Sequence, residues 1–262
     1  MKFTKEDMEY LSGAKFSIWY KLRLSNNPLF SRSEFILDIT KHKRILHIGC
    51  CDHIPLILDK VKKKTWLHGL LTENCSFVAG IDIDTEAIQY VNNNIPIHGE
   101  CMGGNTDIVS KNKMNPYNIY YADITKMIPK ELQNEKFDYA ILGEVIEHVN
   151  DPVSFLRAVK ENLKNNVEKI IISVPYAFGV RQMFNGFLKR ENINSDHRYW
   201  FTPYTIAKVC VEAGIYPEEL LFCGNPPKIL RILRKMKKIL HLHDLSCFST
   251  LSNVLVVIAS VK

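Results

Sequence analysis

Residues 137–149 read Phe-Asp-Tyr-Ala-Ile-Leu-Gly-Glu-Val-Ile-Glu-His-Val, an apolar run that ends in three ionisable side chains. The first six residues have the composition of a buried strand. In an open α/β sheet, ligands bind where parallel strands reach their carboxyl ends. If the chain turns helical there, Glu144, Glu147 and His148 share one face, because they are spaced i, i+3 and i+4. This stretch therefore predicts a site that holds one ion or one proton relay.

Apolar runs alternate with amphipathic segments along the rest of the chain, in the order of a doubly wound, Rossmann-like α/β fold. We expect strands at residues 44–48, 77–82, 118–122, 137–142, 169–174, 220–222 and 254–258. Residues 4–40 have a helical pattern, with a break predicted at 25–28. The chain is thus expected to form an N-terminal helical cap (1–40) and one domain (41–262), in which residues 95–116 are a surface excursion.

Composition limits the classes of protein to which the chain can belong. With 262 residues, of which 46% are hydrophobic and 24% charged, it can bury a large core and differs from disordered proteins. No apolar run approaches the roughly 18 residues that span a bilayer. The first residues lack the basic-then-apolar order of a signal peptide, so we expect a cytoplasmic protein whose seven cysteines are reduced.

The net charge of +6 is unevenly distributed, because six cations fall between Lys228 and Lys238. Apolar residues at helical spacing accompany them, so residues 228–240 are predicted to form an amphipathic helix. Its basic face could simply be solvated, or it could meet a phosphate-bearing substrate, an anionic membrane surface or a nucleic acid. Few aromatic residues are interleaved with these cations, which makes nucleic acid the less favoured partner. The sequence leaves the oligomeric state open.

Three residues at the predicted strand ends indicate a nucleoside site. Gly49 follows the first strand, and a residue without a side chain lets a ligand approach the backbone. Asp82 ends the second strand, where a carboxylate can accept both hydroxyls of a ribose, and Asp123 follows the third. Each carboxylate alone could equally be a helix N-cap. Because the chain lacks G-x-G-x-x-G, a nucleoside without phosphates fits better than a dinucleotide.

At these positions the chain resembles the class I S-adenosylmethionine-dependent methyltransferases, over roughly residues 40–262. Residues 46–52, 80–84, 121–124 and 144–149 are similar to the family's four motifs. The resemblance implies a seven-stranded sheet whose last strand is antiparallel, and S-adenosylmethionine as cofactor. It implies that the cofactor contacts are His47, Gly49, Cys50, Asp52, Asp82, Ile83, Asp123, Ile124 and Gly143.

Two positions depart from the family's first motif. His47 stands where the family usually has an acidic residue, and Cys51-Asp52 replaces later glycines. We expect His47 to hydrogen-bond the methionine carboxylate of the cofactor and Asp52 to receive its ammonium group.

Residues 195–204 resemble a group of bacterial methyltransferases of surface-polysaccharide and small-molecule pathways. The Glu-x-x-Glu-His pattern with a later Asp-His also resembles the small-RNA 3′-terminal 2′-O-methyltransferases, which hold a divalent metal. Carried over, that pattern gives Glu144, Glu147, His148 and His197 as ligands. Mixed oxygen and imidazole ligands suit manganese, and magnesium is a further candidate. Many metal-free methyltransferases also carry Glu-His after the fourth strand. The sequence therefore leaves two alternatives, a metal site and a metal-free site with the same residues.

The expected chemistry is an in-line displacement, in which most of the acceleration comes from aligning donor and acceptor. An alcohol acceptor must also lose its proton, for which His148 or His197, assisted by Glu147, is the candidate base. In a predicted insertion at about 176–203, the candidate acceptor-binding residues are Tyr176, Arg181, Arg198 and Trp200. We expect an O-methyltransferase of a small anionic metabolite or activated sugar. An RNA 2′-O-methyltransferase and a non-catalytic cofactor-binding paralogue are the alternatives.

Overall fold

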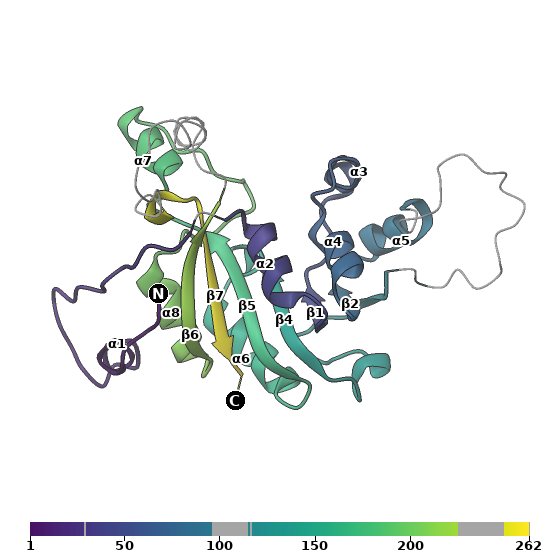
Figure 1. Cartoon of the computed structure of the whole chain (residues 1–262), viewed down its shortest axis with the longest axis horizontal. Coiled ribbons are helices and arrows are strands. Elements are labelled where there is room, and N and C mark those ends of the chain that lie inside the picture. Colours follow the sequence, from purple (N-terminus) through teal and green to yellow (C-terminus); the bar gives the residue numbers. More distant parts are fainter. Residues whose placement is uncertain (29, 96–114, 116, 225–248, 262) are drawn as a thin grey trace, which may run out of the picture.

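The computed structural model describes residues 1–28, 30–95, 115, 117–224 and 249–261. Its centre is a seven-stranded sheet in the order β3-β2-β1-β4-β5-β7-β6 (Figure 1). The strands are β1 (Arg44–Ile48), β2 (Phe77–Asp82), β3 (Ile119–Tyr121), β4 (Phe137–Gly143), β5 (Val167–Pro175), β6 (Tyr216–Cys223) and β7 (Val254–Ser260). Only β7 runs antiparallel to its neighbours, β5 and β6. The predicted fold class, with an antiparallel last strand, is confirmed.

Helices cover both faces of this sheet, as alternate residues of each strand require. Ile141 of β4 packs with Phe35 and Leu71 on one face, whereas Ala140 and Leu142 pack with α6 and α8 on the other. The α-helices are α1 (Lys5–Leu11), α2 (Arg32–Thr40), α3 (Ile54–Lys62), α4 (Leu67–Asn74), α5 (Thr85–Asn94), α6 (Pro152–Leu163), α7 (Val180–Phe187) and α8 (Pro203–Glu212). Two 3₁₀ turns are η1 (Lys130–Leu132) and η2 (Ile146–His148).

The N-terminal segment is less helical than its sequence pattern predicts. Helices α1 and α2 each begin at a capping box, formed by Thr4 and Ser31, but the described residues between Ser12 and Ser31 are not helical. The predicted break near Pro28 therefore extends over most of this segment. The reason lies at Asn27, whose side-chain oxygen accepts from the Phe222 N–H at 2.9 Å and whose amide donates to the Phe222 carbonyl at 3.0 Å. Pairing with the edge strand β6 holds this part extended.

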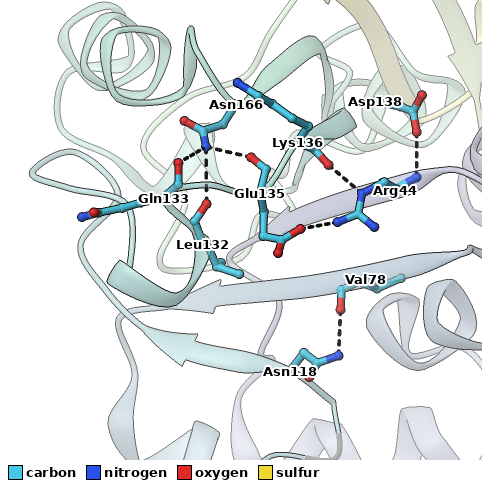
Figure 2. Close-up of polar contacts among 9 residues, drawn as sticks. All are labelled: Arg44, Val78, Asn118, Leu132, Gln133, Glu135, Lys136, Asp138 and Asn166. Atoms are coloured by element: carbon cyan, nitrogen blue, oxygen red, sulfur yellow. Dashed lines mark hydrogen bonds and ion pairs between the residues drawn. The ribbon is translucent and has the colours of Figure 1, made fainter.

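The amino ends of the strands are fastened by side chains that bind backbone groups (Figure 2). The Arg44 N–H donates to Asp138 at 2.8 Å, and the Arg44 guanidinium donates to the Lys136 carbonyl and pairs with Glu135. The amide of Asn166 donates to the carbonyls of the η1 loop, those of Leu132, Gln133 and Glu135. This end of the sheet is thus fixed, and the opposite, carboxyl end is left to form a site.

Two predicted segments fall outside the described residues, namely most of the excursion at 95–116 and the basic helix at 228–240. Within the described part of the chain, no helix has both the length and the apolar character needed to cross a bilayer.

Candidate functional site

A cavity of about 530 Å³ lies at the carboxyl ends of β1, β2 and β4, where the sequence placed the site. The predicted residues that line it are His47, Gly49, Cys50, Asp52, Asp82, Ile83, Gly143, Glu144, His148 and His197. The structure therefore brings together most of the cofactor-binding candidates and three of the four metal-ligand candidates. We refer to this space as the cofactor-side cavity.

The turn after β1 requires a glycine. Gly49 has a φ of +66°, in the left-handed region, and a Cβ there would lie 2.6 Å from the Cγ2 of Val145. Beyond the turn, the N–H of Cys51 donates to Asp82 at 2.8 Å, and the N–H of Asp84 donates to it at 3.0 Å. These bonds orient the Asp82 carboxylate, which is buried and retains acceptor sites toward the cavity. Burial raises the pKa of Asp82 above its usual value.

A pair of buried histidines sets the proton positions beside this turn. The His68 Nε2 lies 2.9 Å from the Tyr117 carbonyl, so it must carry the hydrogen, because a carbonyl can only accept. Burial lowers the pKa of His68 to about 4 and the pKa of His47 well below its usual value, so both rings are neutral at pH 7. The unprotonated His68 Nδ1 then accepts from the His47 Nδ1, which lies 3.3 Å away. His47 is left with a bare Nε2, a hydrogen-bond acceptor, beside Gly143 in the cavity wall.

Three cofactor-binding candidates have other partners. Asp123 accepts from the N–H and hydroxyl of Thr125, and this hydroxyl contact, followed by the one with Lys126, lowers its pKa. Ile124 is buried in the core, and neither Asp123 nor Ile124 lines the cofactor-side cavity as the described residues form it. Asp52 does line it, but its carboxylate forms an ion pair with Lys60 at 2.6 Å.

The ionisable cluster after β4 contains a carboxylate in an unusual state. Glu147 is fully buried, and neither of its carboxylate oxygens has a hydrogen-bond partner among the described residues. Burial, and then the charge of Glu144, raises the pKa of Glu147 to about 8. A buried polar group without a partner destabilises a fold, and such groups concentrate at functional sites.

Two histidines surround this carboxylate. His197 Nε2 lies 3.9 Å from a Glu147 oxygen, and the rings of His148 and His197 meet edge to face with centroids 4.6 Å apart. The Nδ1 atom of His197 is buried and also lacks a partner within the described structure. Burial, and then His148, lowers the pKa of His197. One ligand atom from each of the three residues lies within 4.8 Å of the others, close enough for a single ion.

Glu144 is held apart from the other three ligand candidates, and the single helical face expected from the spacing does not form. Glu144 has a φ of +61°, and the chain forms a 3₁₀ turn only from Ile146 to His148. The Glu144 carboxylate accepts from the Ser173 hydroxyl and lies 3.5 Å from the Arg32 guanidinium. The reason is that Glu144, between β4 and η2, is in the left-handed conformation, so helical spacing does not apply from this residue onward.

Arg32 was not among the residues predicted to form the site. It lies at the start of α2, lines the cofactor-side cavity and pairs with Glu144. Its place in the sequence, just after a helix cap and far from every motif, carries no sign of this role. Only the packing of α2 against the sheet brings it there.

A second cavity of about 340 Å³ adjoins the first. It shares Asn194 and His197 with the cofactor-side cavity, and we refer to it as the acceptor-side cavity. Two predicted acceptor-binding residues, Arg181 and Trp200, line it. The indole N–H of Trp200 donates to Glu191 at 2.8 Å.

The other two acceptor-binding candidates have structural contacts. The Arg198 N–H donates to the Glu147 carbonyl at 2.8 Å, and its guanidinium donates to the carbonyls of His148 and Asp196. Arg198 therefore fastens the segment that carries His197 onto η2. Tyr176 is 3% exposed, packs against Phe222 in the core, and does not line either cavity as described.

A second group of possible metal ligands, Cys50, Cys51 and Asp82, lies at the Gly49 turn. Burial raises the pKa of the Cys50 thiol well above its usual value. Because a metal binds the thiolate form, this shift makes the group a poorer metal site than the one at Glu147.

Comparison with known proteins identifies the family to which the chain belongs. Residues 39–220 match a family model described as a methyltransferase domain. No curated protein sequence is significantly similar to the chain.

Several solved structures align with the chain at low sequence identity. Magnesium protoporphyrin IX methyltransferase from Synechocystis PCC 6803, with bound SAH, aligns over 87% of this chain and 81% of its own, with 8% identity and a TM-score of 0.49. The small RNA methyltransferase HEN1 aligns over 92% of this chain and 27% of its own, with 13% identity and a TM-score of 0.49. An S-adenosylmethionine-dependent methyltransferase from Mesorhizobium loti aligns over 87% and 97%, with 14% identity and a TM-score of 0.46.

Proposed function

Because the chain belongs to the methyltransferase domain family and is an S-adenosylmethionine-dependent methyltransferase, we propose that it methylates an oxygen atom of a small anionic acceptor. The observation that carries this proposal is the meeting of two cavities at His197. One cavity has the Gly49 turn and Asp82, and the other has Arg181 and Trp200. A methyl donor and an acceptor bound in these cavities would meet beside His197, which suits a reaction that depends on alignment.

In this proposal the cofactor supplies an electrophilic methyl group, and residues of the cofactor-side cavity hold it. The oriented carboxylate of Asp82 accepts from the ribose hydroxyls, and the Gly49 backbone allows close approach. The bare Nε2 of His47 can accept a hydrogen bond but cannot donate one. We therefore assign His47 to the ammonium group of the methionine moiety, in place of the carboxylate expected from sequence. Lys60 lines the same wall, where it pairs with Asp52. We assign its ammonium group to the carboxylate of the cofactor's methionine moiety.

In this proposal His197 removes the proton of the acceptor hydroxyl. Its lowered pKa keeps the imidazole neutral at pH 7, so it can take up a proton. Glu147 lies 3.9 Å from the His197 Nε2, so an imidazolium there favours the ionised form of Glu147, and the resulting carboxylate stabilises the imidazolium in return. Arg198 holds the backbone on both sides of this pair through its bonds to η2.

As the alternative to a metal-free relay with His197 as base, the donor atoms at Glu147, His148 and His197 fit a divalent metal. Both Glu147 oxygens and the His197 Nδ1 lack partners among the described residues, which is the state that ligand binding relieves. One carboxylate and two imidazoles suit manganese better than magnesium, which prefers oxygen alone. A bound metal would act as a Lewis acid toward the acceptor oxygen. Glu144, the fourth predicted ligand, would have to leave Arg32 to join this sphere.

The anionic nature of the acceptor is inferred from Arg181, an exposed cation on the wall of the acceptor-side cavity. An activated sugar of a polysaccharide pathway is one acceptor of this kind. RNA is the runner-up, because the Glu147 cluster would serve a 2′-hydroxyl equally well. A non-catalytic paralogue is less favoured, since a fold has no need of a buried, unpartnered carboxylate of raised pKa.

The test is formation of S-adenosylhomocysteine, followed by mass spectrometry, with sugar nucleotides, phosphorylated metabolites and RNA oligonucleotides as acceptors. We expect turnover with one of the small anions, and we expect Arg181→Gln to raise its KM while the cofactor Kd is unchanged. Arg157→Gln, on the distant helix α6, is the matched control. Turnover with RNA alone, falling steeply as salt rises, would contradict the small-acceptor proposal.

A further inference from the structure

Helix α7 has its polar and apolar faces reversed relative to the usual helix of a globular domain. Phe184 and Phe187 are 61% and 83% exposed, and Met183 is also exposed. On the opposite side Asn185 is only 5% exposed, and it accepts a hydrogen bond from Arg190. A surface helix normally turns its apolar residues toward the core. The apolar face of α7 therefore fits a partner outside the domain.

The charge around this face indicates the chemistry of the partner. Residues 176–191 contain three cations, Arg181, Lys189 and Arg190, and one acidic residue, Glu191, which gives this segment a net charge of +2. All three cations are exposed, and the exposed side chains of Phe178 and Leu188 extend the apolar surface beside them. An apolar face with phenylalanines, flanked by a segment of net positive charge, is the pattern of helices that lie in the interface of an anionic membrane.

The position of α7 links this surface to the site. The helix stands at the margin of the molecule, beyond the carboxyl end of β5 (Figure 1). Its polar residues Arg181 and Gln182 line the acceptor-side cavity. A surface that binds the apolar face of α7 would thus lie next to the opening through which an acceptor enters.

We propose that α7 is a peripheral membrane anchor, with Phe184 and Phe187 inserted at the acyl boundary and Lys189 and Arg190 at the level of anionic headgroups. Arg181, on the cavity wall, is then the cation that faces both the membrane surface and the acceptor. The proposed role of α7 does not depend on whether the acceptor is the small anion proposed above, because membrane binding is measured without turnover.

The experiment is co-sedimentation of the full chain with vesicles of phosphatidylcholine alone or mixed with phosphatidylglycerol. We expect binding to the mixed vesicles that weakens with salt. Phe184→Ser/Phe187→Ser should weaken it about tenfold or more, because two large apolar side chains no longer enter the interface. Lys189→Gln should weaken it by about fivefold, as expected for one cation near an anionic surface.

Phe16→Ser/Trp19→Ser is the matched control, because these side chains are 87% and 85% exposed elsewhere on the molecule. It should retain vesicle binding, and the α7 double variant should retain cofactor binding and turnover of a soluble acceptor. The proposal is overturned if the wild type ignores anionic vesicles or if the control variant loses binding equally. It is also overturned if light scattering reveals a dimer that the α7 variant dissociates, since the face would then belong to a second copy. Loss of binding only in Arg231→Gln/Arg234→Gln/Lys235→Gln/Lys238→Gln would place the membrane contact in that stretch instead.

Discussion

At the scale of single residues, the position of one proton on His47 decides what the cofactor site can recognise. The chain of contacts from the Tyr117 carbonyl through His68 leaves the His47 Nε2 bare. The methyltransferase family usually has an acidic residue at this position, and its carboxylate would likewise only accept hydrogen bonds. His47 with His68 therefore reproduces the hydrogen-bonding capacity of a carboxylate without its charge.

We predict that His47→Leu weakens S-adenosylmethionine binding by about 1–3 kcal/mol, the usual effect of leaving a charged donor without its acceptor. Isothermal titration calorimetry should detect the loss with the intact cofactor and no loss with an analogue that lacks the amino group. If the loss persists with that analogue and disappears with one lacking the carboxylate, His47 faces the carboxylate instead. His68→Leu should weaken binding less, because His47 can still adopt the required tautomer part of the time.

The buried environment of Glu147 makes the stability of the fold depend on pH. Its pKa is raised from 4.5 to about 8, so the unfolded chain releases this proton near pH 4.5 and the folded chain only near pH 8. The folded state therefore loses stability as the pH rises between these values, because the unfolded chain is stabilised by ionising Glu147 while burial keeps the folded chain protonated.

We predict that Glu147→Gln, at pH 8 and without added metal, is more stable than the wild type by on the order of 3 kcal/mol. The difference should shrink toward pH 5, and urea unfolding followed by circular dichroism at several pH values measures it. Glu161→Gln, on the exposed surface of α6, is the control and should leave the pH profile unchanged. A wild-type stability that rises from pH 5 to pH 8 relative to Glu147→Gln would show that Glu147 is not held protonated.

At the scale of elements, the segment after residue 194 and the turn η2 act together, since Arg198 joins them through the backbone carbonyls of Glu147 and His148. This contact places His197 beside Glu147. Arg181, by contrast, has its place on the wall of the acceptor-side cavity. The sequence predicted the same acceptor-binding role for both arginines. Their different positions in the structure should make them affect different kinetic constants.

We predict that Arg198→Ala lowers kcat at least tenfold with little change in the acceptor KM, because a shift of His197 impairs the reaction after binding. Arg181→Gln should raise KM with little change in kcat. Steady-state kinetics with the acceptor that turns over in the proposed screen distinguishes the two. An Arg198→Ala enzyme with raised KM and normal kcat would return Arg198 to the role of an acceptor anchor.

Asn27 is the contact by which the N-terminal segment pairs with the sheet edge at β6. We predict that Asn27→Ala destabilises the fold by about 2–3 kcal/mol, because it leaves the buried N–H and carbonyl of Phe222 without these bonds. Chemical denaturation measures the loss, and Asn26→Ala at the exposed neighbouring position is the control. Equal stability of the two variants would mean that the segment contributes little to the edge.

At the scale of the whole molecule, metal binding, protonation and folding are linked through the Glu147 cluster. A metal bound to Glu147, His148 and His197 must displace the Glu147 proton, so its affinity should increase with pH up to about 8. Binding to the folded chain alone raises the melting temperature.

We predict that manganese raises the melting temperature of the wild type more at pH 8 than at pH 6, and more than magnesium does at equal concentration. Differential scanning fluorimetry measures both shifts. Glu147→Gln and His197→Ala should abolish the effect, and His53→Ala, on an exposed histidine outside the cluster, should retain it. Full methylation after exhaustive chelation, with no thermal shift by any divalent ion, would leave His197 and Glu147 as a metal-free proton relay.

The sequence alone determined the sheet and the edge at which the site lies. Runs such as Ile170–Ile172 are apolar without alternation because central strands are buried on both faces, and this needs no knowledge of their neighbours. The ordered positions of Gly49 and Asp82 at strand ends likewise predict that the two residues line one site, because parallel strands end at a common edge, and the structure places both on one cavity. Patterns of this kind are local, and local patterns are readable in one chain.

Tertiary structure alone decided which side chains meet. It brought Arg32 from the N-terminal segment to Glu144, used Arg198 to fasten a loop, and placed Tyr176 in the core. It also held the first segment extended against β6 and gave α7 an outward apolar face. These outcomes depend on contacts between residues distant in the chain and on a left-handed turn at Glu144 that helical spacing could not anticipate. Burial then set the protonation of Glu147 and His47, because desolvation acts only once the surrounding chain is in place.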